Sequence, residues 1–219
     1  MRIKNKNIKK FLSLPIVCWS IIAAKKTHLF NKVIVSTDDK RISKIAKKFG
    51  AEVPFMRPKN ISEDNTGIQD VIIHAIKYYN KKNVEPKFVC CINATAPFIK
   101  PKDIIKGFKK IKKQKNNFVF SASLNDYPLQ RSFTATNDGI DMIFPKFYNT
   151  NSQKLKKTYH DSGQFYWAKS DTWLNNKKIF SKKSSMICIP SYRSQDINTL
   201  QDWKISELKH KILKKYEKK

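Results

Sequence analysis

The sequence lacks a long hydrophobic run. Its most apolar window, residues 12–24, is shorter than the ~20 residues that a membrane-spanning helix needs, and it contains Pro15 and Ser20. No small-residue cleavage site of the kind that ends a signal peptide follows this window. We therefore expect a cytoplasmic protein with no membrane segment.

The sequence has few cysteines, and their spacing is not that of a metal site. All four, Cys18, Cys90, Cys91 and Cys188, lie in apolar stretches without a CxxC pair. Such thiols are typical of a protein core in a reducing compartment. We expect all four to be buried.

Arginine is scarce although the chain is strongly basic. The net charge is +28, yet only five of the 45 basic residues are arginine, and the lysines are spread over the whole chain. A nucleic-acid surface would instead gather arginines and aromatic residues on one face. The composition argues against nucleic acid as a partner and favours anionic small molecules, whose local concentration a positive field raises.

No Gly/Ser/Pro-rich linker, internal repeat or low-complexity tract divides the 219 residues, so we expect a single domain spanning residues 1–219. Pro15 is well placed to begin a largely buried helix. Further on, apolar and amphipathic runs alternate, which predicts strands at 32–37, 52–55, 88–93 and 118–122 and helices near 39–49, 67–80 and 102–113. This alternation indicates an α/β fold: a mostly parallel sheet with helices on both faces.

The alternation breaks between residues 125 and 160. Residues 133–144 predict two short strands around a turn at Asn137-Asp-Gly139, so we expect a β-hairpin inserted into the sheet topology. Apolar strands resume at 165–168 and 186–189. A final helix, about 199–216, begins in an acidic segment and ends in lysines, as a helix dipole favours.

Three segments carry a resemblance to a known family. They are the strand-helix-strand unit that runs from Lys32-Val-Ile-Val-Ser-Thr-Asp-Asp-Lys40 to Pro58, the run Cys90–Phe98 and the run Tyr159–Trp167. They resemble the cytidylyltransferases that activate nine-carbon sugar acids, above all the pseudaminic acid branch, and the likeness covers nearly the whole chain. It implies a Rossmann-like nucleotidyltransferase fold. The implied reaction transfers CMP from CTP to pseudaminic acid, with sialic or legionaminic acid as alternative substrates.

The start of the chain departs from the family pattern. Relatives begin with an apolar strand and a phosphate-binding loop, whereas this sequence opens just before the Lys-Asn pair that follows them, at Lys6 and Asn7. We expect an N-terminally incomplete domain, either because translation starts upstream of Met1, which we favour, or because this is a truncated, inactive copy. A rival of another class is a non-enzymatic basic protein that binds nucleic acid.

The resemblance implies a nucleotide site built from two segments of the chain. Lys6 and Asn7 match residues that contact phosphate and nucleotide, and Lys6 would also act in catalysis by offsetting charge on the triphosphate. Arg57, Thr66 and Gly67 match the segment around the cytosine and ribose of CTP. Because parallel strands end at one edge, Arg57 should share a rim with Thr37 and Asp38. The alternatives are a solvated basic end and a structural Arg-Pro turn.

A carboxylated, hydroxyl-rich sugar needs a bidentate cation and several hydroxyl, amide and carboxylate partners. The resemblance implies that these are Asn93, Thr95, Gln130, Arg131, Tyr159, His160, Asp161, Ser162 and Gln164. Arg131 would bind the sugar carboxylate, and either Asp161 or a water would take the proton. Ordinary turn chemistry and a structural His-Asp hydrogen bond are the alternatives. The inserted element at about 125–160 resembles the part with which relatives form homodimers and complete each other's sugar site.

Asp196 and Asn198 stand where the family has an Asp-x-Asp pair that binds Mg²⁺. A hard cation prefers carboxylate oxygens and keeps several waters, so Asp196 is the expected catalytic metal ligand. Asn198 can supply a carbonyl oxygen but lacks the second negative charge. Helix capping is the alternative role for both residues.

Overall fold

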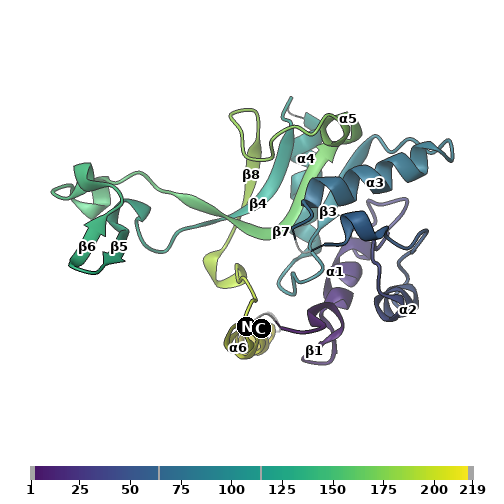
Figure 1. Ribbon diagram of the computed structural model, residues 1–219, viewed down its shortest axis with the longest axis horizontal. Coiled ribbons are helices and arrows are strands. Elements are labelled where there is room, and N and C mark those ends of the chain that lie inside the picture. The colour runs from purple at the N-terminus through teal and green to yellow at the C-terminus, as the bar shows by residue number, and fades with distance from the viewer. Residues whose placement is uncertain (1–2, 64, 114, 217–219) are drawn as a thin grey trace.

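In a computed structural model of the chain, which describes residues 3–63, 65–113 and 115–216, the centre of the fold is a four-stranded sheet with the order β3-β7-β4-β8 (Figure 1). Three strands, β3 (Phe88–Ile92), β4 (Phe118–Leu124) and β8 (Ser185–Ile189), run in one direction. The fourth, β7 (Tyr159–Lys169), runs antiparallel between β3 and β4. The sheet is therefore mixed, with most strands parallel.

Helices cover both faces of this sheet. On one face, α4 (Pro101–Lys113) and the end of α1 (Ile16–Lys25) pack on alternate β7 side chains, Phe165 and Trp167. On the other face, α3 (Ile68–Asn80) and α5 (Ser170–Leu174) pack on Tyr166 and Ala168. The α/β architecture predicted from the alternation of apolar runs is confirmed.

The strands predicted at 32–37 and 52–55 pair with each other but do not join the sheet. They form two isolated parallel bridges, Ile34 to Glu52 and Thr37 to Met56, on either side of α2 (Lys40–Lys48) in the chain. The backbone N–H of Val35 donates to the Glu52 carbonyl at 2.9 Å. This pair therefore remains a separate unit, and β3 is an edge strand of the main sheet.

The two ends of the described chain pack together. A short hairpin of β1 (Lys10–Phe11) and β2 (Leu14–Pro15), which the sequence pattern did not predict, precedes α1. Phe11 and Ile16 pack on Trp203 of α6 (Leu200–Tyr216), in a cluster that also includes Ile197. This contact places the segment before α6 beside the N-terminal segment.

The predicted insertion is a hairpin of β5 (Phe133–Thr136) and β6 (Gly139–Met142), which projects beyond the ends of β4 and β7 (Figure 1). Short 3₁₀ turns complete the chain at Lys6–Ile8, Lys59–Ile61, Leu129–Arg131, Pro145–Phe147, Ser152–Lys154 and Ser191–Arg193. In the described part of the chain, no helix is both long and apolar enough to span a bilayer.

Two sequence predictions need correction. The strand expected at 165–168 begins at Tyr159, because the polar residues before it pair with the end of β4. Cys188 is exposed and Cys90 is half-buried, whereas all four cysteines were expected inside. Successive side chains of β8 point to opposite faces of the sheet: Ile187 packs on the core, and Cys188 on the other face is exposed.

Gly107 lets α4 lie directly on β7. A Cβ at this position would come within 2.7 Å of the Phe165 ring and 2.8 Å of the Trp167 ring, both of which are almost fully buried. Neither ring is the free end of a flexible side chain, so the helix itself would have to move.

We predict that Gly107→Ala lowers the free energy of unfolding by about 1–3 kcal/mol, the usual cost of overpacking a core. Helix propensity alone predicts the opposite sign, a gain of up to about 1 kcal/mol. Urea unfolding of parent and variant measures the difference, with Lys106→Ala as an exposed control in the same helix. A stabilised Gly107→Ala variant would show that this contact is not tight.

Candidate active site

One edge of the sheet gathers polar side chains from distant parts of the sequence. The carboxyl ends of β3, β4 and β8 meet there, and the antiparallel β7 begins there. His160 joins the strand ends, because its Nδ1 lies 2.7 Å from Asn125 Oδ1 and its Nε2 lies 3.2 Å from Ser194 Oγ. Asn125 and Ser194 were not predicted as site residues.

β7 carries a β-bulge at this edge. Ala122 of β4 pairs with Asp161, but Phe120 pairs with Tyr166, so residues 162–165 bulge opposite Ser121. The backbone N–H groups of Gln164 and Phe165 both donate to Ser121 Oγ at 3.1 Å. β-Bulges beside active sites often change the direction of side chains, and the predicted sugar-binding residues Ser162 and Gln164 lie in this one.

Asn93 and Asp161 hold the bulge from two sides. Asn93 Nδ2 donates to the Gly163 carbonyl at 2.8 Å, and Asp161 Oδ1 accepts from the Gly163 N–H at 2.9 Å. Gly163 has φ of 61°, a left-handed conformation that favours glycine. Asp161 Oδ2 accepts a short hydrogen bond from the Tyr166 hydroxyl. Burial, and then Asp161, raise the pKa of Tyr166 well above its usual value, so this hydroxyl stays protonated and donates.

Two polar atoms in the bulge have no partner. Ser162 Oγ and Gln164 Oε1 are buried and accept or donate no hydrogen bond among the described residues. The other end of the Gln164 amide is fixed, since its Nε2 donates to the Arg193 carbonyl at 2.8 Å. An unsatisfied buried polar group costs about 1–3 kcal/mol. A water or a polar ligand that binds at the bulge can therefore form hydrogen bonds with Ser162 Oγ and Gln164 Oε1.

The segment before α6 places an exposed carboxylate at the same edge. Asp196 Oδ2 accepts from Asn198 Nδ2 at 2.7 Å, and Lys6 Nζ donates to the Ile197 carbonyl at 2.7 Å. The predicted phosphate lysine and the predicted metal segment, far apart in sequence, are thus in contact.

Neither Asp196 nor Asn198 supplies the side-chain cap of α6. Thr199 Oγ1 accepts from the Asp202 N–H at 3.1 Å, and Asp202 Oδ2 accepts from the Thr199 N–H at 2.7 Å. This reciprocal pair is a capping box, and the hydrogen bonds from Thr199 lower the pKa of Asp202. Helix capping therefore does not account for the Asp196 side chain.

Within residues 3–63, 65–113 and 115–216, no three His, Cys, Asp or Glu side chains form a group that could hold a metal ion. Asp196 and Asn198 instead offer an exposed carboxylate and a neighbouring amide, whose nitrogen donates to that carboxylate. This donor set fits a hard cation that takes its remaining ligands from water and phosphates.

The predicted nucleotide residues lie beside the separate strand pair. The Arg57 N–H donates to the Thr37 carbonyl at 2.8 Å, and Arg57 Nη2 lies 3.4 Å from Asp38 Oδ1, so the expected rim is present. Arg57 Nε donates to Ser62 Oγ at 3.1 Å. Thr66 and Gly67 lead into α3, where Gly67 provides no side-chain cap.

Arg41 connects this rim to the N-terminal turn. Its Nη2 donates to Asn5 Oδ1 at 3.0 Å and also forms an ion pair with Asp39 at 2.6 Å, which lowers the pKa of Asp39 to about 2. Asn5 directly precedes Lys6 and Asn7, so a continuous set of contacts runs from Arg57 to Asp196. Asn7 is half-buried here, as is Thr95 in the loop after β3.

Two predicted sugar residues lie elsewhere. Gln130 Nε2 donates to the Lys156 carbonyl at 3.0 Å, and Arg131 donates to the Tyr148 and Thr150 carbonyls at 2.9 and 2.7 Å. These bonds tie together the projecting insertion, so a single chain does not bring Arg131 to Asp161. Tyr159, partly exposed, stands where β7 leaves the insertion.

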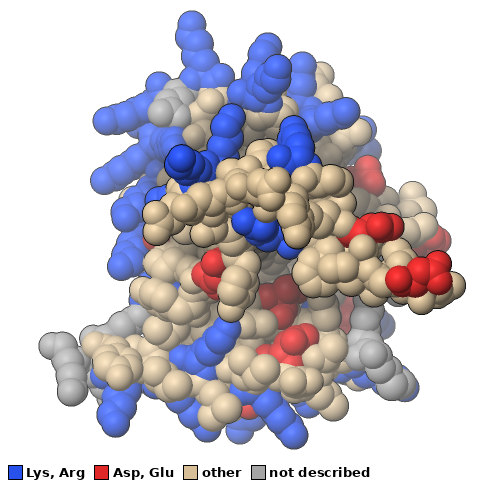
Figure 2. Space-filling view, turned by 90° about the vertical axis from the view of Figure 1, so that its left-hand side faces the viewer, with Lys and Arg blue, Asp and Glu red and all other residues tan. Residues whose placement is uncertain are grey.

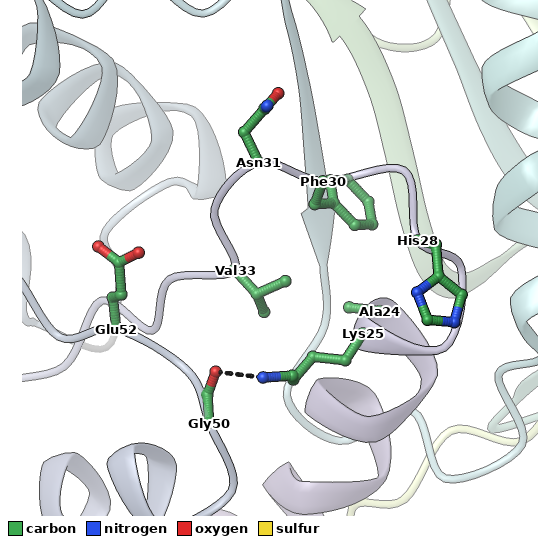
Figure 3. Close-up of a pocket in the computed structure, with 8 residues that line it drawn as sticks. All are labelled: Ala24, Lys25, His28, Phe30, Asn31, Val33, Gly50 and Glu52. Atoms are coloured by element: carbon green, nitrogen blue, oxygen red, sulfur yellow. Dashed lines mark hydrogen bonds between the residues drawn. The ribbon is translucent and has the colours of Figure 1, made fainter.

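A cavity beside the end of α1 is not at this edge. It has a volume of about 380 Å³ and is lined by Ala24, Lys25, His28, Phe30, Asn31, Val33, Gly50 and Glu52 (Figure 3). Lys25 Nζ donates to the Gly50 carbonyl at 3.0 Å beside it. None of the predicted site residues lines this cavity, and we place the candidate site at the sheet edge, where the polar groups converge.

Basic side chains are widespread on the face of the molecule that Figure 2 shows. Figure 2 shows Lys and Arg side chains around most of one side of the molecule, with Asp and Glu between them and toward its right side. The dispersed lysine excess inferred from the sequence is visible on this face, where the Lys and Arg side chains do not form a single stripe.

An α/β sheet with polar groups converging at its carboxyl edge is the architecture of many nucleotide-dependent transferases. The family model described as "Cytidylyltransferase" matches residues 1–218. A pseudaminic acid cytidylyltransferase of Campylobacter jejuni is 38% identical over 96% of this chain and 91% of its own length. A second protein of that name, from another serotype, is 35% identical over the same shares.

Among solved structures, a CMP:2-keto-3-deoxy-manno-octonic acid synthetase complexed with CTP superposes with a TM-score of 0.69. It is 13% identical and covers 98% of this chain and 94% of its own, so this likeness shows the fold alone. The chain belongs to the cytidylyltransferase family. It is a CTP-dependent nucleotidyltransferase with a Rossmann-like fold.

Proposed function

We propose that the chain transfers CMP from CTP to pseudaminic acid and releases pyrophosphate. The choice of sugar rests on the similarity of this chain to two proteins that are named for that activity. They are 38% and 35% identical to it over almost the whole chain. The four free cysteines suit a reducing compartment, and we assign the reaction to the cytoplasm.

In this proposal the nucleotide lies between the separate strand pair and the N-terminal turn. Arg57, Thr66 and Gly67 contact the cytosine and ribose, while Lys6 and Asn7 face the triphosphate. The contacts from Arg57 through Arg41 to Asn5 support this arrangement, since they hold both groups along one surface. Lys6 would leave its bond to the Ile197 carbonyl, or share it, to offset phosphate charge.

The sugar acid lies on the β7 bulge. Ser162 and Gln164 present unpaired buried atoms that can bond sugar hydroxyl or amide groups. His160, held between Asn125 and Ser194, and Asn93 and Thr95 complete this surface. Both Asp161 oxygens already accept hydrogen bonds, so we assign Asp161 to orienting the sugar and the proton acceptor to a water.

The reaction is an in-line attack of the anomeric hydroxyl on the α-phosphorus of CTP, in which positioning and charge stabilisation supply most of the rate. Cytidylyltransferases of this kind generally use a divalent metal. We assign Mg²⁺, with Asp196 and Asn198 as its protein ligands; when bound, it would neutralise charge developing on the phosphates. The contact between Lys6 and Ile197 would keep the cationic side chain beside this segment.

The projecting insertion supports a homodimer. It exposes several large apolar side chains, among them Tyr127, Phe133, Ile140 and Tyr148, with exposed fractions of 85, 58, 63 and 68%. A cluster of this kind usually marks a contact with another chain. Arg131, together with Gln130, would then reach the sugar site of the partner and bind the carboxylate there.

For the reaction itself, we expect CTP, Mg²⁺ and pseudaminic acid to give a CMP-sugar and pyrophosphate. The kcat/KM for CTP should be at least about a hundredfold above that for UTP. A site whose polar groups hydrogen-bond cytosine leaves those groups unpaired when uracil is bound. The assay uses the 219-residue chain and a form with any in-frame residues encoded before Met1. Equal use of UTP would refute the cytosine pocket, and faster turnover of sialic or legionaminic acid would refute the sugar assignment.

For the metal ligands, we expect Asp196→Asn to lower kcat by roughly 10²-fold or more. Asn198→Asp should lower the Mg²⁺ concentration for half-maximal rate several-fold, because it adds a carboxylate. Asp171→Asn, which removes an exposed carboxylate in the first turn of α5, is the control and should leave the magnesium titration unchanged. Magnesium titrations of Asp196→Asn and Asn198→Asp that overlay the parent curve would remove the metal from this segment.

For the dimer, light scattering coupled to size exclusion should give the parent the mass of two chains. The pair Phe133→Lys and Ile140→Lys should give single chains, since it places charge in an apolar contact. Leu208→Lys on α6 is matched in exposure, 59% against 58% for Phe133, and should stay dimeric. A monomeric parent contradicts the assembly and the shared sugar site.

A further inference from the structure

Arg193 is a buried arginine beside the candidate site that sequence reasoning did not single out. It ends the 3₁₀ turn that follows β8, three residues before Asp196. Its Nη1 lies 2.7 Å from Asp103 Oδ2, in the first turn of α4, and the two side chains are only 4 and 5% exposed. The signal in the sequence was the use of arginine where this chain otherwise chooses lysine.

Arg193 contacts two further parts of the structure near the site edge. Besides Asp103, its Nη1 lies 3.5 Å from the carbonyl of Phe98, in the loop that continues from Asn93 and Thr95. Its own carbonyl accepts from Gln164 Nε2 at 2.8 Å, which fixes the orientation of the amide in the β7 bulge. One residue thus joins α4, the loop after β3, the bulge and the segment that carries Asp196.

Stability does not explain this arrangement. Removing two charges from water is costly, and an apolar pair of similar volume is often as stable as a buried ion pair or more so. The Lys32–Glu52, Arg41–Asp39 and Arg57–Asp38 pairs, by contrast, remain open to solvent. Unlike two apolar side chains, the buried ion pair fixes how Arg193 is oriented relative to Asp103, because a guanidinium fork and a carboxylate meet in few geometries.

We propose that Arg193 is a positioning residue for CMP transfer: it fixes the spacing between the segment 194–198, which carries the metal ligands, and Gln164 on the sugar side. The expected effect of Arg193 on catalysis rests on the proposed function. The expected effect on structure, which is that Arg193 restricts the motion of residues 191–198, does not depend on that function.

The test compares Arg193→Met, Arg193→Lys and the double variant Asp103→Leu/Arg193→Met, with Lys32→Met as a control that breaks an exposed pair. Arg193→Met alone should lower the Tm, because it leaves the Asp103 charge buried and unpaired. The double variant should regain the parent Tm. Its residues 191–198 should nevertheless exchange amide hydrogens at least about tenfold faster than in the parent, while β4 and α4 keep their protection.

In the same double variant, kcat should fall by about 10²-fold and the Mg²⁺ concentration for half-maximal rate should rise, since small misplacements of reacting groups cost rates of this size. Arg193→Lys keeps the charge without the fork and should give intermediate values. A double variant with the parent Tm, parent exchange and parent kinetics overturns the proposal, and so does faster exchange with unchanged kinetics. If the parent protein does not transfer CMP, the proposed function is overturned instead. Amide hydrogen exchange then decides whether Arg193 restricts the motion of residues 191–198.

Discussion

The packing of β7 is the constraint on which the candidate site depends. Its second half, Phe165 to Ala168, is buried between helices on both faces of the sheet. Full burial of one side chain such as Phe165 contributes about 1.5–3 kcal/mol. Because the strand is antiparallel to β3 and β4, this anchored half leaves the polar half, Tyr159 to Gln164, at the carboxyl ends of its neighbours. The core thus determines where the sugar-side groups lie.

Local periodicity was sufficient for much of the fold. The helices predicted near 39–49, 67–80 and 102–113 lie within a residue of α2, α3 and α4, since each has its own apolar stripe and an identifiable start. Pairing was harder to predict because it depends on distant partners. The polar start of β7 has no strand-like alternation of its own, and it is extended because Leu124 and its neighbours pair with it. The separation of the 32–37 strand from the sheet had no local signal either.

Local pattern gave little of the candidate site: Asn93 was expected because it ends an apolar strand, whereas His160, Asp161 and Asp196 were expected from the family resemblance. The contacts at the sheet edge bring the segments of these residues together. The residues that hold them were not predictable: Ser121 and Tyr166 look like ordinary strand residues, and Asn125 like an ordinary loop residue, until their partners are known. Arg193 illustrates a further limit, since its importance comes from Asp103, ninety residues away in sequence.

The central claim is that the nucleotide binds along the surface from Arg57 to Asp196, beside the carboxyl edge of the sheet, rather than in the cavity near the end of α1. A crystal structure of the protein with CTP and Mg²⁺ tests this most directly. The account predicts the cytosine beside Arg57 and Gly67, and the triphosphate between Lys6 and Asp196. A nucleotide bound instead in the cavity lined by Lys25, His28 and Glu52 would contradict it.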